Sequence, residues 1–318
     1  MKQVWIAVWI ALASVNAIAQ SFPAKPMRIV VGFPPGGPAD ALARVLSQGF
    51  FDAMGQPAVV ENKTGAAGNI GVDQVAKSAP DGYTMGIIPA GNIAVNPALY
   101  PNLPYKTADL AAVSMLATVE NVLVVNPSVP AQNLRELIEL ALQKPDTLSF
   151  ASPGAGSQAH LAGELLALNA NVRLVHVPYK GTGPALTDLL GGQVTMMFAQ
   201  LSSALSHIKS GKLRAIGVAS LKRSAVVPDV PTIAEQGMAR FEAVSWYALM
   251  VPAGTPREVI DRLSAETTRL LARTELKERL AVSGMDLVGG RPQDLAATIQ
   301  SESARWADLI KRRGIKPE

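Results

Sequence analysis

The sequence contains no cysteine. This absence excludes disulfide bonds, thiolate metal sites, a cysteine nucleophile and a lipid-anchored thiol at a mature N-terminus. Charged residues are also scarce, at 17% of the chain, and the formal net charge is only +4. The densest basic cluster, Lys311-Arg312-Arg313, stands at the end of a helical pattern, where cations face the negative pole of a helix. Because the chain lacks a basic stripe with interleaved aromatic residues, we expect no nucleic-acid partner.

Long apolar runs are missing beyond the N-terminus. The run from Val4 to Val15 is about a dozen residues, whereas a membrane-spanning helix needs roughly 20. It follows Lys2 and precedes Ala17-Ile18-Ala19, a small-x-small pattern that suits signal peptidase. We therefore expect residues 1–19 to be a signal peptide, cleaved near Ala19, and the mature protein to be soluble and periplasmic. A retained N-terminal membrane helix is the alternative.

The remaining length and the apolar content predict two domains. About 299 residues would remain after cleavage, a length at which single cores usually divide, and 48% of the chain is apolar. From Met27 onward, short β-branched runs alternate with helical patterns, as in βαβ units. The fold class expected is α/β, in which each domain is a doubly wound, mostly parallel sheet with flanking helices.

The order of these patterns predicts where the domains divide. The first series begins with a strand at Met27–Val31, and the second begins with a strand at Leu148. Two apolar segments, Ala111–Val125 and Trp246–Val251, are interpreted as strands that cross between domains. We place domain one at 21–121 and 252–318 and domain two at 122–251, with crossings near 122 and 246.

Two helices are predicted after the second crossing. Thr255-Pro256-Arg257-Glu258 fits a capping box with proline at the first helical position. A last helix near Asp294–Lys311 is expected to stop at Gly314. Both helices belong to domain one in this interpretation.

Three loops rich in proline and glycine follow predicted strands. In open α/β sheets, ligands bind beyond the carboxyl ends of the strands, where helix N-termini present unpaired N–H groups. Glycine lets the backbone approach a ligand, and proline limits the entropy lost on binding. The loops are Phe33–Asp40, Ser152–Ser157 and Tyr179–Gly183. Loops from both domains could close on one anion, or each could be an ordinary turn in which Ser157 and Asp40 only cap helices.

Enzyme interpretations fit less well. Gly154-Ala155-Gly156-Ser157-Gln158-Ala159 matches the dinucleotide fingerprint, but the following strand ends at His176 and Val177 instead of an acidic residue. The sequence has no G-x-S-x-G nucleophile elbow. His160, His176 and His207 lack metal-ligand spacing, so no metal site and no cofactor are expected. His160, one turn into a helix, could support its loop or reach a ligand.

Motifs along nearly the whole mature chain resemble the Bug family, the substrate-binding components of tripartite tricarboxylate transporters. They begin with Pro26–Val31, Pro34-Pro35-Gly36-Gly37, Asp40 and Ala43-Arg44. The later matches are Val60–Lys63 with Gly65 and Gly68, Pro80–Thr84, Asn96–Tyr100, Ser152–Gly154 with Gly156-Ser157 and His160, Val177–Gly181, Pro228–Thr232 and Pro252–Pro256.

The resemblance implies a two-domain periplasmic binding protein, or Venus flytrap, that performs no chemistry. It implies that a small di- or tricarboxylate or aromatic acid is held between the first two loops and passed to integral-membrane permease subunits. At the end of the third strand, Pro89–Asn92 lacks the hydroxyl residue common in the family, which suggests a less polar distal pocket. The residues expected to bind the ligand are Phe33, Gly37, Pro38, Ala39, Asp40, Ala90, Gly91, Asn92, Gly154, Gly156, Ser157, His160, Tyr179 and Lys180. We expect a monomer; a ligand sensor and, less favoured, an exported α/β enzyme are the alternatives.

Overall fold

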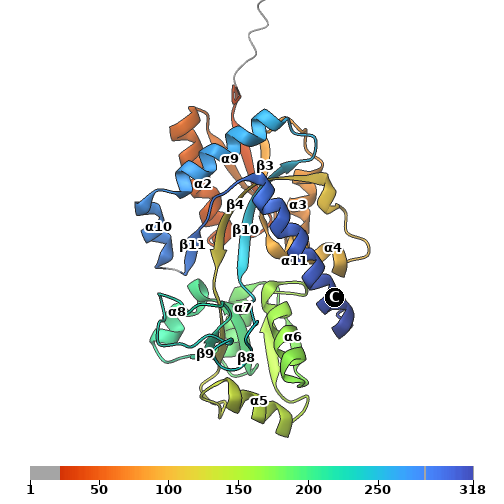
Figure 1. Cartoon of the computed structure of the whole chain (residues 1–318), viewed down its shortest axis with the longest axis vertical. Helices are drawn as coiled ribbons and strands as arrows, with labels where there is room; N and C mark the ends of the chain where they lie inside the picture. The colour runs from red at the N-terminus through yellow and green to blue at the C-terminus, as the bar shows by residue number, and fades with distance from the viewer. Residues whose placement is uncertain (1–21, 283, 318) are drawn as a thin grey trace, which may run out of the picture.

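The computed structural model describes residues 22–282 and 284–317, so the expected signal peptide lies outside the described residues. Two separate sheets with flanking helices make up the molecule (Figure 1). The first sheet has the strand order β11-β4-β10-β3-β1-β2, and the second has the order β7-β6-β8-β5-β9. This arrangement confirms the two-domain α/β fold.

Each sheet is formed by strands from separate parts of the chain. The first sheet comprises β1 (Met27–Val31), β2 (Ala58–Asn62), β3 (Thr84–Pro89), β4 (Leu110–Val119), β10 (Ser245–Pro252) and β11 (Met285–Leu287). The second sheet comprises β5 (Asn121–Val125), β6 (Ser149–Ser152), β7 (Val175–Pro178), β8 (Met196–Gln200) and β9 (Arg214–Val218).

Helices flank both sheets. Those that lie between strands of the first sheet, or after them, are α2 (Pro38–Met54), η1 (Ala66–Gly68), α3 (Asn69–Ala76), the π-helical turn η2 (Gly91–Val95), α4 (Asn96–Leu99), η3 (Thr107–Asp109), α9 (Arg257–Leu271), α10 (Thr274–Ala281) and α11 (Pro292–Arg313). Those that lie between strands of the second sheet are α5 (Leu134–Gln143), α6 (Gln158–Ala170), α7 (Thr182–Leu190) and α8 (Leu201–Lys209). No helix in the described part of the chain is long and apolar enough to cross a membrane.

Local sequence explains the first βα unit. The central residues of β1 are apolar and buried, as expected for a strand covered on both faces. Helix α2 begins with Pro38, which has no N–H to leave unpaired, and ends at Gly55 with φ of 70°. Between these ends, Leu42, Leu46 and Phe50 are fully buried on one face of the helix.

The sheets are mixed, whereas the sequence predicted mostly parallel ones. The βαβ units give parallel pairs, such as β1 with β2 and β3, and β6 with β7 and β8. The crossing strands run the other way: β10 is antiparallel to β3 and β4, and β5 is antiparallel to β8 and β9. A chain that leaves one sheet and later returns to it enters from the opposite end, which explains the antiparallel pairs.

The chain crosses between the sheets at two places. The segment predicted as one strand, Ala111–Val125, is divided at Glu120 into β4 and β5. On the return, β10 pairs with β3 and β4 of the first sheet. Residues 246–251, which the sequence assigned to domain two, therefore lie in the first sheet, and the crossing precedes Ser245.

Side chains from three elements bind the returning segment. Asn121 donates from Nδ2 to the carbonyl oxygen of Ala243 at 2.6 Å, and Gln158 donates from Nε2 to Val244 O at 3.0 Å. Arg305 of α11 donates to the preceding carbonyl, that of Glu242. Three successive carbonyl groups are thus fixed by β5, α6 and α11.

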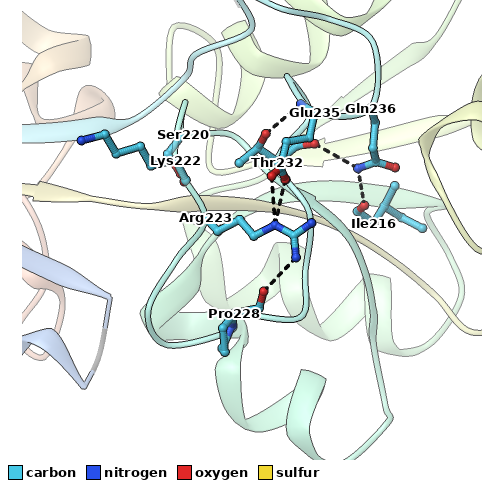
Figure 2. A network of polar contacts seen from close by, with 8 residues as sticks. All are labelled: Ile216, Ser220, Lys222, Arg223, Pro228, Thr232, Glu235 and Gln236. Atoms are coloured by element: carbon cyan, nitrogen blue, oxygen red, sulfur yellow. Dashed lines mark hydrogen bonds and ion pairs between the residues drawn. The ribbon is translucent and has the colours of Figure 1, made fainter.

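The segment between β9 and β10, residues 219–244, is also held by polar side chains (Figure 2). Arg223 donates from Nε to both carboxylate oxygens of Glu235 at 3.0 Å. Gln236 then donates from Nε2 to the carbonyl oxygen of Ile216 in β9 at 2.9 Å. These bonds attach a segment with little regular secondary structure to the second sheet.

Of the two helix boundaries predicted near the end of the chain, the end of α11 agrees with the structure and the start of α9 differs. Helix α11 ends at Gly314, which has φ of 62°, as predicted. Thr255 does not cap α9, because the helix begins at Arg257 with Pro256 at the cap position. The Thr255 hydroxyl instead donates to the carbonyl oxygen of Pro252 at 2.7 Å.

Each sheet with its helices forms one of two bodies, the first built on the six-stranded sheet and the second on the five-stranded sheet. Helix α11 contacts both bodies, although the sequence assigned all of 252–318 to domain one. Leu295 and Ile299 pack in a core with residues of β3 and β10. Two turns later, Trp306, Leu309 and Ile310 pack with residues of α6 and the second sheet. Figure 1 shows α11 passing from the upper body to the lower one. The helix is therefore a third connection between the bodies.

Truncating a side chain in the C-terminal half of α11 tests how much its packing on the second core contributes to stability. Leu309 is buried in the second core, so we expect Leu309→Ala to lower the free energy of unfolding by about 2–5 kcal/mol. Asp308, on the same turn, forms only an exposed ion pair with Arg312, and Asp308→Ala should change stability by less than about 0.5 kcal/mol. Urea denaturation of both variants makes the comparison. Equal midpoints would show that the end of α11 is not packed as described.

Candidate functional site

The β1–α2 loop, residues 32–37, is fixed by the carboxylate of Asp40. Asp40 is 3% exposed and accepts hydrogen bonds from the Gly36 amide at 3.1 Å and from Asn62 Nδ2 at 3.1 Å. Arg44, one turn further along α2, donates to both Asp40 oxygens at 2.9 and 3.2 Å. Asp40 was predicted to bind the ligand or cap the helix. Its carboxylate does not cap α2 but accepts hydrogen bonds from the loop and from Arg44, and its contact with a ligand stays a prediction.

This set of donors keeps Asp40 ionised. Burial alone would raise the pKa of Asp40. The hydrogen bonds from Arg44 and the other two donors outweigh that effect and hold the pKa below its ordinary value. The Arg44 guanidinium balances the negative charge, so the start of α2 presents the N–H end of the helix next to a neutralised carboxylate.

The start of α2 has the features of an anion site. No side chain caps the helix at Gly37, and the first turn contains Pro38, Ala39 and Asp40. First-turn N–H groups have no partner within a helix and carry the positive end of its dipole. A Cβ atom at Gly37 would meet no other atom within 4 Å, so this side of the loop is open.

The β6–α6 loop, residues 153–157, forms hydrogen bonds mainly within its own unit. The Gly154 amide donates to Ser152 Oγ at 3.2 Å, and the Gly156 amide donates to His160 Nδ1 at 3.2 Å. Ser157 caps α6, since its Oγ accepts from the His160 amide at 3.3 Å. The amides of Gly154 and Gly156, expected to face a ligand, are therefore used inside the loop. The start of α6 at Ser157 is the helix N-terminus that this loop carries.

Two histidines support this loop from behind. The rings of His160 and His176 stack with centroids 3.8 Å apart and an interplanar angle of 7°. Phe150 lies beside both rings, with its centroid 4.9 Å from that of His176 and 6.2 Å from that of His160. The Nε2 atom of His176 lies 2.6 Å from Ser152 Oγ. His160 is 4% exposed, so of the two roles considered for it, this structure shows support of the loop.

The environment keeps both histidines neutral. Burial, with a smaller effect of the neighbouring His176, lowers the pKa of His160 to about 3. Burial likewise lowers the pKa of His176 to about 4. Neutral His160 can therefore accept a hydrogen bond at Nδ1, as the geometry requires.

The loops of the two bodies touch at Gly156. A Cβ atom at Gly91 would lie 3.0 Å from the Gly156 carbonyl oxygen, and one at Gly156 would lie 2.6 Å from Asn96 Oδ1. A Cβ atom at Gly156 would clash unless Asn96 moved, and one at Gly91 would make a very tight contact with the backbone. The start of η2 and the β6–α6 loop are therefore in direct backbone contact.

Further close contacts connect Phe33, Asn92 and Tyr179 to the region around Gly91 and Gly156. A Cβ atom at Gly68 would lie 2.7 Å from the Phe33 ring and 3.3 Å from Asn92 Nδ2. One at Gly154 would lie 3.6 Å from the Tyr179 carbonyl oxygen. Residues of the three predicted loops and of the end of β3 thus form one contiguous region.

Asn92 belongs to a buried amide network. Asn69 Oδ1 accepts from Asn92 Nδ2 at 2.8 Å, from Asn96 Nδ2 at 2.7 Å and from Tyr105 Oη at 2.8 Å. Asn92 Nδ2 also donates to the Ala67 carbonyl oxygen at 3.0 Å. Its amide nitrogen therefore binds the scaffold, and Ala90 beside it is buried and apolar.

The two residues predicted from the β7–α7 loop, Tyr179 and Lys180, have different environments. The Tyr179 hydroxyl donates to Asp188 Oδ2 at 2.7 Å, so it is tied to α7. Burial and this hydrogen bond raise the pKa of Tyr179 to about 12. Lys180 is exposed at the same loop.

One segment of the region was missing from the predicted site. Ala66 and Ala67, in η1, have φ of 46° and 52°, a conformation that is unfavourable for residues with a Cβ atom. Gly65 and Gly68 flank them, and Gly68 contacts Phe33. Local backbone strain of this kind concentrates at functional sites. The signal in the sequence was Gly-Ala-Ala-Gly directly after a strand.

The arrangement favours binding over chemistry. The described residues contain no group of three or more histidines, acids or cysteines that could hold a metal ion. The hydroxyl of Ser157 caps α6, and the nearby histidine nitrogens are engaged by Gly156 and Ser152. What the region offers is a pair of helix N-termini with glycine-rich approaches, which suit an anion.

The neutral histidines predict a specific pH dependence of stability. An unfolded histidine has a pKa near 6.5, above the native values, so the unfolded chain binds more protons between them. Stability should therefore fall as the pH drops below about 6.5. In His160→Asn, whose Oδ1 can replace Nδ1 as an acceptor, this slope should be smaller by up to about 1.4 kcal/mol per pH unit. Urea midpoints at pH 7 and pH 5 measure it, with His207→Asn as control; identical slopes in all three proteins would contradict the assignment.

Comparison with known proteins identifies the family of this chain. The model of the tripartite tricarboxylate transporter family receptor matches residues 42–315. Protein BugT from Bordetella pertussis is 41% identical over 315 residues, which cover 98% of this chain and 97% of BugT.

Solved structures show the same fold. A protein from R. palustris, solved with adipate, has a TM-score of 0.87 and 34% identity over 93% of this chain and 100% of its own. MatC from Rhodopseudomonas palustris, with bound malate, has a TM-score of 0.82 and 33% identity over 91% of this chain and 100% of its own. Because the family model and BugT match nearly the full described chain, the protein belongs to the family of tripartite tricarboxylate transporter receptors, the Bug family that its sequence resembles.

Proposed function

We propose that this protein is a periplasmic receptor that binds a small carboxylate between its two bodies and delivers it to the permease subunits of a tripartite tricarboxylate transporter. The observation that carries the proposal is the direct contact of Gly91 with Gly156. This contact brings the loop at the start of α6 against the first body, on which α2 presents an uncapped N-terminus. Membership of the receptor family supports the transport role.

The carboxylate is held by dipoles in this proposal. Phe33, Gly37, Pro38 and Ala39 line one side, and the start of α6 at Ser157 lines the other, with Lys180 as an exposed cation nearby. Charge-assisted hydrogen bonds from N–H and O–H groups contribute about 1.5–3 kcal/mol each. Asp40, Asn92, His160 and Tyr179 support the loops through hydrogen bonds.

The ligand is a di- or tricarboxylate, or an aromatic acid, with an apolar body. Two relatives were solved with the dicarboxylates adipate and malate. In this chain, Ala90 and Gly91 follow β3, and the amide nitrogen of Asn92 is used by Asn69 and Ala67. Few polar groups are then left for the distal part of the ligand, which favours an aliphatic or aromatic body over a hydroxylated one.

We also propose a refined domain division. Domain one comprises residues 22–120 and 245–301, which include the first turns of α11, and domain two comprises residues 121–244. The strand pairing of β10 supports the boundary before Ser245, and the separate packing of Leu295 and Trp306 supports α11 as a shared helix. We also propose that the protein functions as a monomer, because loops of both bodies of one chain meet at the candidate site.

Two substitutions at Ser157, by Asp and by Asn, test the anion site, because the two new side chains have the same shape and differ in charge. Asp and Asn both cap helices about as well as Ser, so Ser157→Asp and Ser157→Asn should keep the stability of the wild type. Asp places a negative charge at the proposed carboxylate site, where like charges about 4 Å apart repel by about 4 kcal/mol. We expect Ser157→Asp to weaken binding at least about a hundredfold and Ser157→Asn by about tenfold or less.

Calorimetry with adipate, malate, citrate and benzoate gives the affinities, and native mass spectrometry of protein purified without refolding identifies a retained acid. A Ser157→Asp protein that binds one of these acids as tightly as the wild type would place the carboxylate elsewhere. An absence of binding of any small acid, together with no retained acid, would count against the proposed function itself.

Export is tested separately. Because Ala17-Ile18-Ala19 fits a signal peptidase site, the mature N-terminus should lie at or within a few residues of Gln20. N-terminal sequencing by mass spectrometry of a periplasmic extract measures this. Recovery of the intact chain, beginning with Met1, from the cytosol alone would exclude the signal peptide.

A further inference from the structure

A line of side chains joins the last turn of α11 to the β6–α6 loop. Arg313 donates from Nε to Glu164 Oε2 at 2.8 Å. The other oxygen of Glu164 lies 3.9 Å from His160 Nε2, and His160 Nδ1 accepts from the Gly156 amide at 3.2 Å. Glu164 is 12% exposed and Arg313 is 27% exposed at their side chains, so solvent screens this line only partly.

The tautomer of His160 decides whether the last bond exists. A neutral imidazole carries one proton, so Nδ1 can accept from Gly156 only when the proton is on Nε2. A carboxylate facing Nε2 stabilises a proton there, although 3.9 Å is too long for a direct hydrogen bond. Arg313 holds the Glu164 carboxylate in the required position.

Gly156 is the residue whose orientation matters most for the contact between the bodies. Its φ of 76° lies in the left-handed region, and a Cβ atom at this position would lie 2.6 Å from Asn96 Oδ1, so both the backbone and the surroundings favour glycine here. Its carbonyl oxygen faces Gly91, and its amide faces His160. A change at His160 would therefore be transmitted to the contact at Gly91.

We infer that Arg313, Glu164 and His160 form a positioning relay through which the C-terminal helix sets the His160 tautomer and, with it, the conformation of the ligand loop. The effect on ligand affinity rests on the proposed function, but the effect on the loop does not. Helix α11 suits this role because its first half packs against η2, which carries Gly91, while its last turn holds Glu164. Both partners of Gly156 are thus connected to one helix.

The test compares two adjacent arginines. Arg313→Gln removes the charge that holds Glu164, whereas Arg312→Gln removes an exposed partner of Asp308 that lies outside the relay. Nitrogen-15 NMR of the imidazole rings should show the Nε2–H tautomer for His160 in the wild type and in Arg312→Gln. In Arg313→Gln we expect an added population of the Nδ1–H tautomer and about tenfold faster hydrogen exchange of the Gly156 amide.

Two more variants separate positioning from general destabilisation. Glu164→Gln should produce the same tautomer change as Arg313→Gln, and Arg313→Lys should restore most of the wild-type signal because it restores the charge. A loss of packing alone would speed exchange across α6 without changing the tautomer, and that outcome would overturn the relay. So would wild-type tautomer and exchange in both Arg313→Gln and Glu164→Gln.

Affinity provides a second readout with adipate and malate as probes. Whichever of the two binds the wild type should bind Arg313→Gln about tenfold more weakly and Arg312→Gln equally well. Unchanged affinity in Arg313→Gln, with a changed tautomer, would show that the relay sets the loop without setting binding. If neither acid binds the wild type, the NMR and exchange measurements still decide the relay, and only the proposed function is weakened.

Discussion

The hydrogen bond from the Gly156 amide to Nδ1 of His160 constrains the whole candidate site. It requires a neutral imidazole with its proton on Nε2, and the surroundings meet this requirement, since burial lowers the pKa of His160 to about 3. Gly156 also places its carbonyl oxygen beside Gly91, where a Cβ atom would lie only 3.0 Å from it. The conformation of the loop that meets the first body therefore depends in part on a buried histidine and on what holds that histidine in place.

Helix α11 extends this constraint to the arrangement of the two bodies. Two chain crossings alone, at Glu120 and before Ser245, would form a hinge between the bodies. A continuous 22-residue helix that packs on both cores adds a third connection and restricts that motion. Arg305 reinforces the restriction by binding the carbonyl of Glu242 in the returning segment. Any opening must therefore bend α11, release its last turns from the second core, or carry the returning segment with it.

Sequence patterns predicted the elements and missed the interactions that depend on distance in space. The strand Met27–Val31 and the stop at Gly314 follow from local chemistry and agree with the structure. The three-residue strand β11 is too short to show a period. Asp40 was expected to meet the ligand, although the Asp40–Arg44 spacing of four residues already suited an ion pair on a helix. The stacking of His160 on His176 could not be predicted, because it depends on how α6 packs beside β7.

The charge state of the site explains how an anion can be both bound and released. Asp40 is balanced by Arg44, and both supporting histidines are neutral, so Lys180 is the exposed formal charge that these loops contribute. An anion at the two helix N-termini would then be held mainly by N–H and O–H dipoles. Several such bonds, at about 1.5–3 kcal/mol each, reach the roughly 8 kcal/mol of micromolar affinity without a buried ion pair. If the donors belong to both bodies, as proposed, separating the bodies removes the donors of one body at once, and affinity falls with opening.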